Sequence, residues 1–369
     1  MNTFQYYRTV LSVIAVCANM AYAEDRASFD VQKGTWSLFY QDPETSQWVN
    51  KVYVARTAIK PIIKSVVVGN ASYFSYQYTV RNRRDASQNI SVMRVWGIPM
   101  IYAVPNLPPV TAKRSETDTW TQQYWKQLKA KNSFEHSVVR GPNGWSAGLR
   151  VDDSANQTSF VWTPGLKVTD SNGVEPGRTQ SGFVVLRPEL PGVARTYLQG
   201  RIAEPWILDG VPDTPFWTQK VTEIEDQDYV LVPVLAPVIP LPVPYDAAEL
   251  ARRIKAHVQT WLKYGHLNAD MLTKLNRQFD VLIPALERGN KQAAFAAIEA
   301  MRKDCADRHP SFRDDYIDSD ADEHDAQEMP RNAAQRSASP QLAVDRVAVR
   351  ALAFDLRYIM ERLGRPSAK

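Results

Sequence analysis

The apolar residues of this chain repeat with two different periods, and the change falls near Asp246. Between residues 27 and 230, apolar and polar residues alternate one by one in short runs. After residue 246, apolar residues recur every three or four positions over stretches of helical length. A period of two is that of a β-strand, and a period of 3.6 is that of an α-helix. The sequence therefore predicts an α+β protein of two domains, a β domain followed by a helical one.

The β domain is expected over residues 24–230. Its clearest strand is 74–81, and the polar turn at 82–89 predicts a hairpin with the apolar run 90–98. Further short strands, separated by Gly, Pro, Asn and Asp, are expected at 35–40, 49–55, 159–162, 182–186 and 196–202. Because no helix-length segment separates most of these runs, we predict an antiparallel, immunoglobulin-like β-sandwich.

One helix is expected inside the β domain. Trp120, Tyr124 and Leu128 are spaced four residues apart, which favours a helix over 117–130.

The helical domain is expected over residues 246–369 as a four-helix bundle. Asp246 can cap the first helix and Gly265 can end it. Pro284 lies inside the second helix and is expected to kink or split it. Ser339-Pro340 predicts the start of the last helix. Each helix carries one apolar stripe, and four such stripes bury each other in a bundle.

Two segments have unusual composition. Residues 231–245, LVPVLAPVIPLPVPY, contain five prolines. Because proline lacks a backbone donor and favours extended chain, we predict a semi-rigid spacer between the domains. Residues 307–338 include DDYIDSDADEHDAQE and few apolar residues, so a disordered acidic insertion in the helical domain is expected.

Residues 1–23 resemble a signal peptide. Arg8 precedes an apolar core at 9–16, and Ala21-Tyr22-Ala23 forms a cleavage site. Cys17 raises the alternative of lipidation, although Val16 stands where a small residue is preferred. We expect a periplasmic or secreted protein with no transmembrane segment after cleavage. The full chain has 44 Lys and Arg against 40 Asp and Glu, and cleavage after residue 23 would remove Arg8 and leave 43 against 40. This balance is too even to favour nucleic acid as a partner.

The motif GWSAG places Ser146 between two glycines, as in serine hydrolases. A nucleophile elbow needs a strand before the serine and a helix after it. A turn precedes Ser146, and polar residues follow soon after it. The hydrolase is therefore the weakest of the hypotheses. Cys305 and His309 are four residues apart, but Cys305 continues an apolar stripe and is expected to be a buried hydrophobic residue.

Asp318, Asp320 and Asp322 fit the first ligand positions of a calcium loop. Glu323 stands where that loop needs glycine, and Met329 where it needs glutamate. The sequence therefore excludes an EF-hand, leaves weak calcium binding as an alternative to a solvated acidic run, and indicates no other cofactor.

Nine of the ten tryptophans lie before position 218. Aromatic faces on a sandwich can stack on sugar rings, whereas a large sandwich also needs aromatic core. Trp145, Trp162 and Trp206 are the candidate ligand-binding residues.

Two groups of motifs resemble known families. YQYTVRNRRDASQNISVMRVWGIP, GPNGW, VWTPG and VEPGRTQSGFVVLRPELPG together resemble a β-domain of exported bacterial proteins of unassigned function. KLNRQFDVLIPALERGNKQAAFAAIEAM followed by RALAFDLRYIMERL resembles the FIMAH-type helical module of extracellular bacterial proteins. Pro284 and the acidic insertion depart from that helical pattern. The resemblance implies an exported, non-enzymatic protein and carries over no catalytic residue.

The leading hypothesis is a non-catalytic binding or structural protein of the bacterial periplasm or cell exterior, whose helical bundle contacts an unknown protein. The alternative is a carbohydrate or envelope-polymer binder that uses aromatic residues of the β domain.

Overall fold

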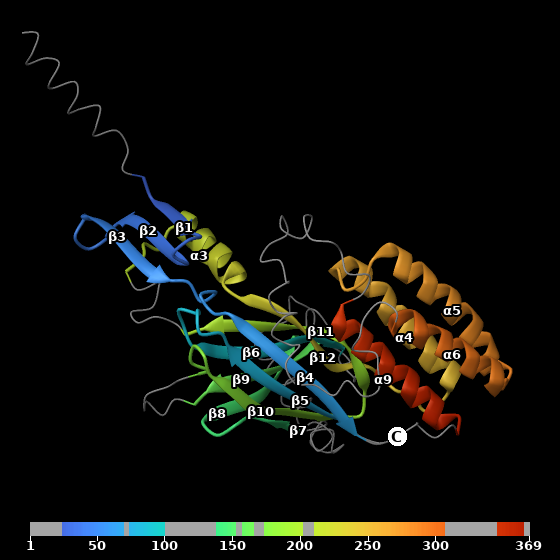
Figure 1. The fold of residues 1–369 in the computed structure, drawn as a ribbon. Helices are drawn as coiled ribbons and strands as arrows, with labels where there is room; N and C mark the ends of the chain where they lie inside the picture. Colours follow the sequence, from blue (N-terminus) through green and yellow to red (C-terminus); the bar gives the residue numbers. More distant parts are fainter. Residues whose placement is uncertain are drawn as a thin grey trace, which may run out of the picture. The chain divides into compact units, whose positions relative to one another are not determined.

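The computed structural model describes residues 24–69, 74–99, 138–152, 157–165, 173–201, 210–306 and 345–364. The chain divides into two compact units, Met1–Ala58 with Gly200–Tyr229, and Ile59–Gln199 with Val230–Lys369 (Figure 1). The predicted signal peptide, the helix at 117–130 and the acidic insertion lie outside the described residues.

The first unit is a small antiparallel sheet with one helix. Strands β1 (Arg26–Asp30), β2 (Thr35–Gln41) and β3 (Trp48–Val54) pair in that order, and α3 (Pro215–Gln227) covers one face. Its core consists of Leu38, Tyr40, Trp217 and Ile224. These strands form a unit separate from the later ones, contrary to the single β domain predicted from the sequence. Helix α3 was not predicted, although it begins at a Thr214 cap followed by proline.

The second unit contains two antiparallel sheets. One has the order β4 (Pro61–Gly69), β5 (Phe74–Asn82), β10 (Thr179–Arg187), β7 (Val138–Arg140). The other has the order β12 (Val230–Ile239), β11 (Leu190–Gly200), β6 (Ile90–Pro99), β9 (Gln157–Pro164), β8 (Trp145–Asp152). Side chains of both sheets, including Tyr78 and Trp162 with ring centroids 5.9 Å apart, share one core.

The predicted hairpin between 74–81 and 90–98 is wrong. Strand β5 pairs with β4 and β10, whereas β6 lies in the other sheet. The buried side chain of Asn82 explains the crossing, because its Nδ2 donates to the Gln88 and Val174 carbonyls at 2.7 and 3.0 Å. These bonds take the chain out of the first sheet and start it on the second.

The predicted proline-rich spacer is also wrong for residues 231–239, because Val230–Ile239 form strand β12 at the edge of a sheet. The Leu235 N–H points away from β11 and donates to Ser65 Oγ at 3.0 Å, and Tyr78 Oη donates to the Leu235 carbonyl at 3.0 Å. Alternate residues of a strand share an orientation, so Pro233 and Pro237 lack their N–H on this same side. Proline is tolerated at such an edge.

Replacing Ser65 by alanine is expected to lower the free energy of unfolding by ~1–3 kcal/mol, because the buried Leu235 N–H then loses its acceptor. Urea unfolding followed by circular dichroism measures the change. Ser75→Ala on β5 is the control, because the Ser75 hydroxyl only accepts an exposed side-chain bond from Gln77. Equal midpoints for the two variants would contradict the role given to Ser65.

The C-terminal region is helical, with α4 (Ala247–Tyr264), α5 (Ala269–Glu287), α6 (Lys291–Ala306) and α9 (Arg346–Arg362). Helix α5 contacts α4 and α6, and α9 contacts α4, α6 and β12. Asp246 caps α4 and Gly265 ends it with φ 74°, as predicted. The expected split at Pro284 is absent, since α5 continues through this proline to Glu287. Helix α9 begins after an Asp345 cap, later than Ser339-Pro340 predicted.

One histidine attaches α4 to the sheet. His257 is half-buried, and its Nε2 accepts the Val193 N–H of β11 at 3.0 Å. A Cβ on the neighbouring Gly192 would lie 2.5 Å from that Nε2 atom and 2.8 Å from Val238 Cβ. Only glycine therefore leaves room for the imidazole.

None of the helices in the described ranges is long and apolar enough to span a membrane.

Candidate functional site

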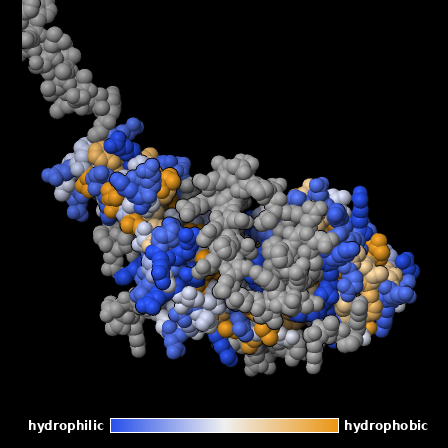
Figure 2. All heavy atoms as spheres, viewed as in Figure 1, coloured by the Kyte–Doolittle hydropathy of each residue, from blue (hydrophilic) through white to orange (hydrophobic). Residues whose placement is uncertain are grey.

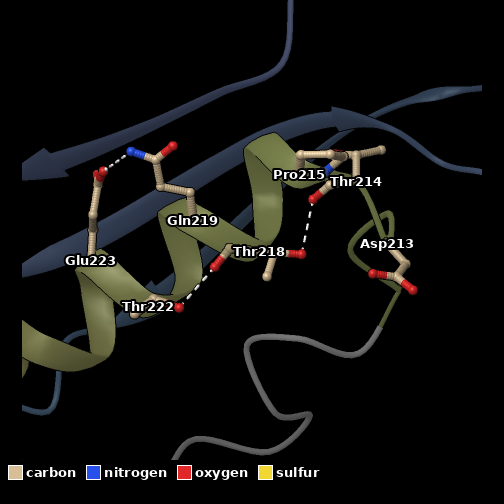
Figure 3. Close-up of a pocket in the computed structure, with 7 residues that line it drawn as sticks. All are labelled: Asp213, Thr214, Pro215, Thr218, Gln219, Thr222 and Glu223. Atoms are coloured by element: carbon tan, nitrogen blue, oxygen red, sulfur yellow. Dashed lines mark hydrogen bonds between the residues drawn. The ribbon is translucent and has the colours of Figure 1, made fainter.

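An open depression of about 600 Å³ lies along the exposed side of α3 (Figure 3). Asp213 and Pro215 line it together with polar side chains of the helix, namely Thr214, Thr218, Gln219, Thr222 and Glu223. The Thr218 and Thr222 hydroxyls donate to carbonyls one turn earlier, at 3.0 and 2.9 Å. Hydrogen bonds from Lys220 and Gln219 lower the pKa of Glu223 and occupy its carboxylate. This depression therefore offers few unengaged groups to a ligand.

The three candidate tryptophans do not form a common surface. Trp162 is fully buried, and its Nε1 donates to the Arg140 carbonyl at 2.9 Å. It is a core residue, so the ligand-binding prediction is wrong for it. Trp145 is half-buried and packs edge-on against Phe183 at 5.0 Å between ring centroids. Trp206 lies outside the described residues.

The reactive side chains are also dispersed. Ser146 is the second residue of β8, pairs with Thr163 of β9, and is followed by more strand. This geometry differs from the strand–turn–helix of a nucleophile elbow. Cys305 is buried, and burial raises the pKa of its thiol to about 12, as expected for a core residue. His309 and the three aspartates of the predicted calcium site, Asp318, Asp320 and Asp322, lie outside the described residues.

An exposed aromatic stack lies on the sheet of the first unit, on the side opposite α3. Alternation along β2 directs Leu38 and Tyr40 into the core and Phe39 to the other side. The rings of Phe39 and Trp48 are parallel to within 10°, with centroids 5.0 Å apart. On the β1 side, the Arg26 guanidinium lies 4.9 Å from the Phe39 centroid. The three side chains form a row across all three strands.

Exposed residues surround this row. Trp48 is 41% exposed and Val52 56% exposed, and Asn50 of β3 lies between them on the same side. Asn50 is paired with Phe39, and Arg26 is paired with Phe39 from the other side. We call this side of the sheet, with Arg26, Phe39, Trp48, Asn50 and Val52, the outer face. Figure 2 shows apolar and hydrophilic side chains interspersed on the visible surface of this unit.

The sequence between Phe39 and Trp48 contains a signal for the outer face. Phe39 and Trp48 flank the turn QDPETSQ, and Asp42 Oδ1 accepts the Glu44 and Thr45 N–H groups at 2.9 and 2.8 Å inside it. Such a turn sets the register of a hairpin, and the register brings the two rings together.

A second polar cluster is buried between the sheets and α9. Arg187 and Glu189 form an ion pair at 2.8 Å, and Tyr76 Oη donates to the Glu189 carbonyl at 2.5 Å. Asp355 of α9 is 1% exposed, and its Oδ1 has no hydrogen-bond partner among the described residues. Burial raises the pKa of Asp355 well above its ordinary value. Burial therefore favours the neutral, protonated form of this carboxyl group.

Comparison with known proteins gives little further guidance. No protein-family model and no curated protein matches the chain. A structural match is an uncharacterized protein from Nocardia farcinica, described as having an immunoglobulin-like fold. The two are 17% identical, and the match covers 42% of this chain and 92% of that one with a TM-score of 0.21. A likeness at that level supports no argument about function.

Proposed function

We propose that this chain is a non-catalytic, exported binding protein of the bacterial periplasm or cell exterior, and that it holds a carbohydrate chain on its outer face. The observation that supports the proposal is the parallel stack of half-buried Phe39 and exposed Trp48. The apolar face of a sugar ring packs on an indole, and nearby side chains bond its hydroxyls. Asn50 and Gln41 are exposed polar neighbours of that stack.

The outer face replaces the tryptophans that the sequence suggested. Trp48 is held by a stacked partner, so its indole loses little further freedom when a ligand binds. Val52 extends the apolar area along the same strand. The exported location rests on the signal-like residues 1–23 and remains part of the proposal.

Replacing Trp48 by alanine is expected to weaken binding to a responsive polysaccharide at least about tenfold, because it removes the exposed stacking ring. Affinity electrophoresis in gels containing cell-wall and capsular polysaccharides measures the loss. Tyr264→Ala is a matched control, since Tyr264 is 38% exposed and also carries an arginine, Arg195, 4.1 Å from its ring. Equal retardation of the two variants, or no retardation of the native chain by any polymer, would refute the proposal.

A protein contact made by the helical region is the second candidate function. The contact would use apolar side chains that these helices expose, namely Leu262 of α4 (43%) and Val281 of α5 (58%). Cross-linking in cells with a photoreactive group at position 262 tests the protein contact. A cross-linked product that persists in the Trp48→Ala variant would separate this contact from carbohydrate binding.

We also propose that α4, α5, α6 and α9 form a four-helix bundle and that the two sheets form an immunoglobulin-like sandwich.

A further inference from the structure

We infer that the outer face selects an acidic polysaccharide, with a sugar ring of the chain on Trp48 and a carboxylate of the same chain on Arg26. This inference rests on the proposed carbohydrate function and adds the charge and the minimum length of the ligand. It follows from how Arg26 is held, from the charges around it, and from its distance to the exposed indole.

The Phe39 ring positions the Arg26 guanidinium without neutralising its charge. Its guanidinium stacks on the Phe39 ring at 4.9 Å, a contact that orients the group while leaving its N–H donors at the surface. Among the described residues, Arg26 takes part in no ion pair. A planar, oriented guanidinium at the surface is suited to a carboxylate, which it can bind through two parallel hydrogen bonds.

The rest of the outer face does not cancel this charge. Its acidic residue, Asp30, lies at the other end of β1, where it accepts the Gln32 and Lys33 N–H groups and pairs with Lys33 Nζ at 3.7 Å. Ser28 and Ser37, which are paired between Arg26 and Asp30, are neutral. Exposed Glu24 lies two residues before Arg26, and Asp42 and Glu44 lie in the turn before Trp48, where Asp42 accepts the Glu44 and Thr45 N–H groups. Among the residues of the outer face, Arg26 is the cation, so it is the group that can complement an anionic ligand.

The spacing requires a chain rather than a single sugar. Arg26 is on β1 and Trp48 on β3, with Phe39 of β2 between them. Two strand spacings separate β1 from β3, about 10 Å. A sugar stacked on the outer side of Trp48 cannot place its own carboxylate on Arg26, so a neighbouring sugar of the same chain supplies it.

The test compares each acidic polymer with its neutral counterpart. Polygalacturonate and alginate are used with their carboxyl-reduced forms, in affinity electrophoresis and in calorimetric titration with defined oligomers. The native chain is expected to bind the acidic form at least about tenfold more tightly. Arg26→Gln should remove that preference and the accompanying salt dependence, while leaving binding to the reduced polymer unchanged. Arg26→Lys should restore part of the preference, because it keeps the charge and loses the planar fork.

Arg178→Gln is the control variant, because Arg178 is an exposed arginine on the other unit that pairs with Glu175 at 3.9 Å. It should keep the full preference for acidic polymer. Circular dichroism of each variant confirms that the fold is retained. Oligomers of increasing length should show weak binding for one sugar and a gain once two or more are present.

The outcomes separate this inference from the proposed function. Equal binding of acidic and reduced polymers, with Trp48→Ala weakening both, would overturn the charge selection and leave the carbohydrate function in place. Insensitivity of all binding to Trp48→Ala would overturn both. A preference for acidic polymer that Arg178→Gln lowers as much as Arg26→Gln would also overturn the assignment to Arg26.

Discussion

Lowering the pH from 7 to 4 is expected to reduce the free energy of unfolding of the second unit by about 3 kcal/mol through His257. Burial, with a smaller contribution from His266, lowers the pKa of His257 from 6.5 to about 4. Above pH 6.5 the imidazole is neutral in both the folded and the unfolded chain. Between 6.5 and 4 the unfolded chain takes up a proton that the folded chain refuses, so stability falls as the pH falls through this window.

The structural reason is the bond from Val193. A protonated imidazole has no acceptor left for the Val193 N–H, so charging His257 removes the bond between α4 and β11 as well as burying a charge. The surrounding space does not allow the ring to turn away easily, because Gly192 and Val238 lie close beside it.

Replacing His257 by glutamine tests this directly. The glutamine amide oxygen can accept the same N–H and does not titrate, so the variant should lose most of the dependence of stability on pH between 6.5 and 4. Urea unfolding at a series of pH values measures it, and hydrogen exchange of the α4 amides shows whether this helix is released first. A variant with the same pH dependence as the native chain would assign that dependence to other groups.

Replacing Asp355 by asparagine is expected to raise the free energy of unfolding at pH 8, because the variant has no carboxyl group that must keep its proton in the folded chain. Because burial raises the pKa of Asp355 far above 3.8, the folded chain keeps a proton that the unfolded chain releases. Stability is therefore lost as the pH rises above 3.8, until the folded carboxyl also ionises. Asparagine has nearly the same shape and cannot ionise, so this loss disappears.

The effect should depend on pH in a way that ordinary packing changes do not. At pH 4 the native chain and the Asp355→Asn variant should be nearly equally stable. The difference between their free energies of unfolding should grow as the pH rises. Asp280→Asn is the control, because Asp280 is 65% exposed and pairs with Lys255 at 2.6 Å. Thermal unfolding at pH 4, 6 and 8 measures both variants. Destabilisation of Asp355→Asn that increases with pH would show instead that a charged Asp355 has a partner.

Elements that depend on neighbouring residues could be predicted from the sequence. Helix α4 begins and ends where its caps indicate, because Asp246 accepts the Ala248 and Glu249 N–H groups at 2.8 and 3.0 Å and Gly265 adopts a left-handed conformation. Strands β2, β3, β5, β9, β10 and β11 cover the alternating runs for the same reason, since alternation sets one face of each strand.

The pairing of strands could not be predicted in this way. Strand β12 looked like a linker because its prolines remove donors, and only Ser65 and Tyr78 from the other sheet show how its outward edge is satisfied. The candidate site shows the same limit. Trp162 and Trp48 are both tryptophans of strands, yet one is buried between two sheets and the other lies exposed beside Phe39.

The sequence by itself determined the two regimes of secondary structure, the caps of α4 and the strand positions, since each depends on residues a few positions apart. The tertiary structure decided which strands pair, that the first three strands form their own unit with α3, and which aromatic rings face solvent. Those outcomes depend on groups far apart in the chain, such as Ser65 with Leu235 and His257 with Val193. Local propensity carries no information about such partners, because their bonds form only after distant segments have come together.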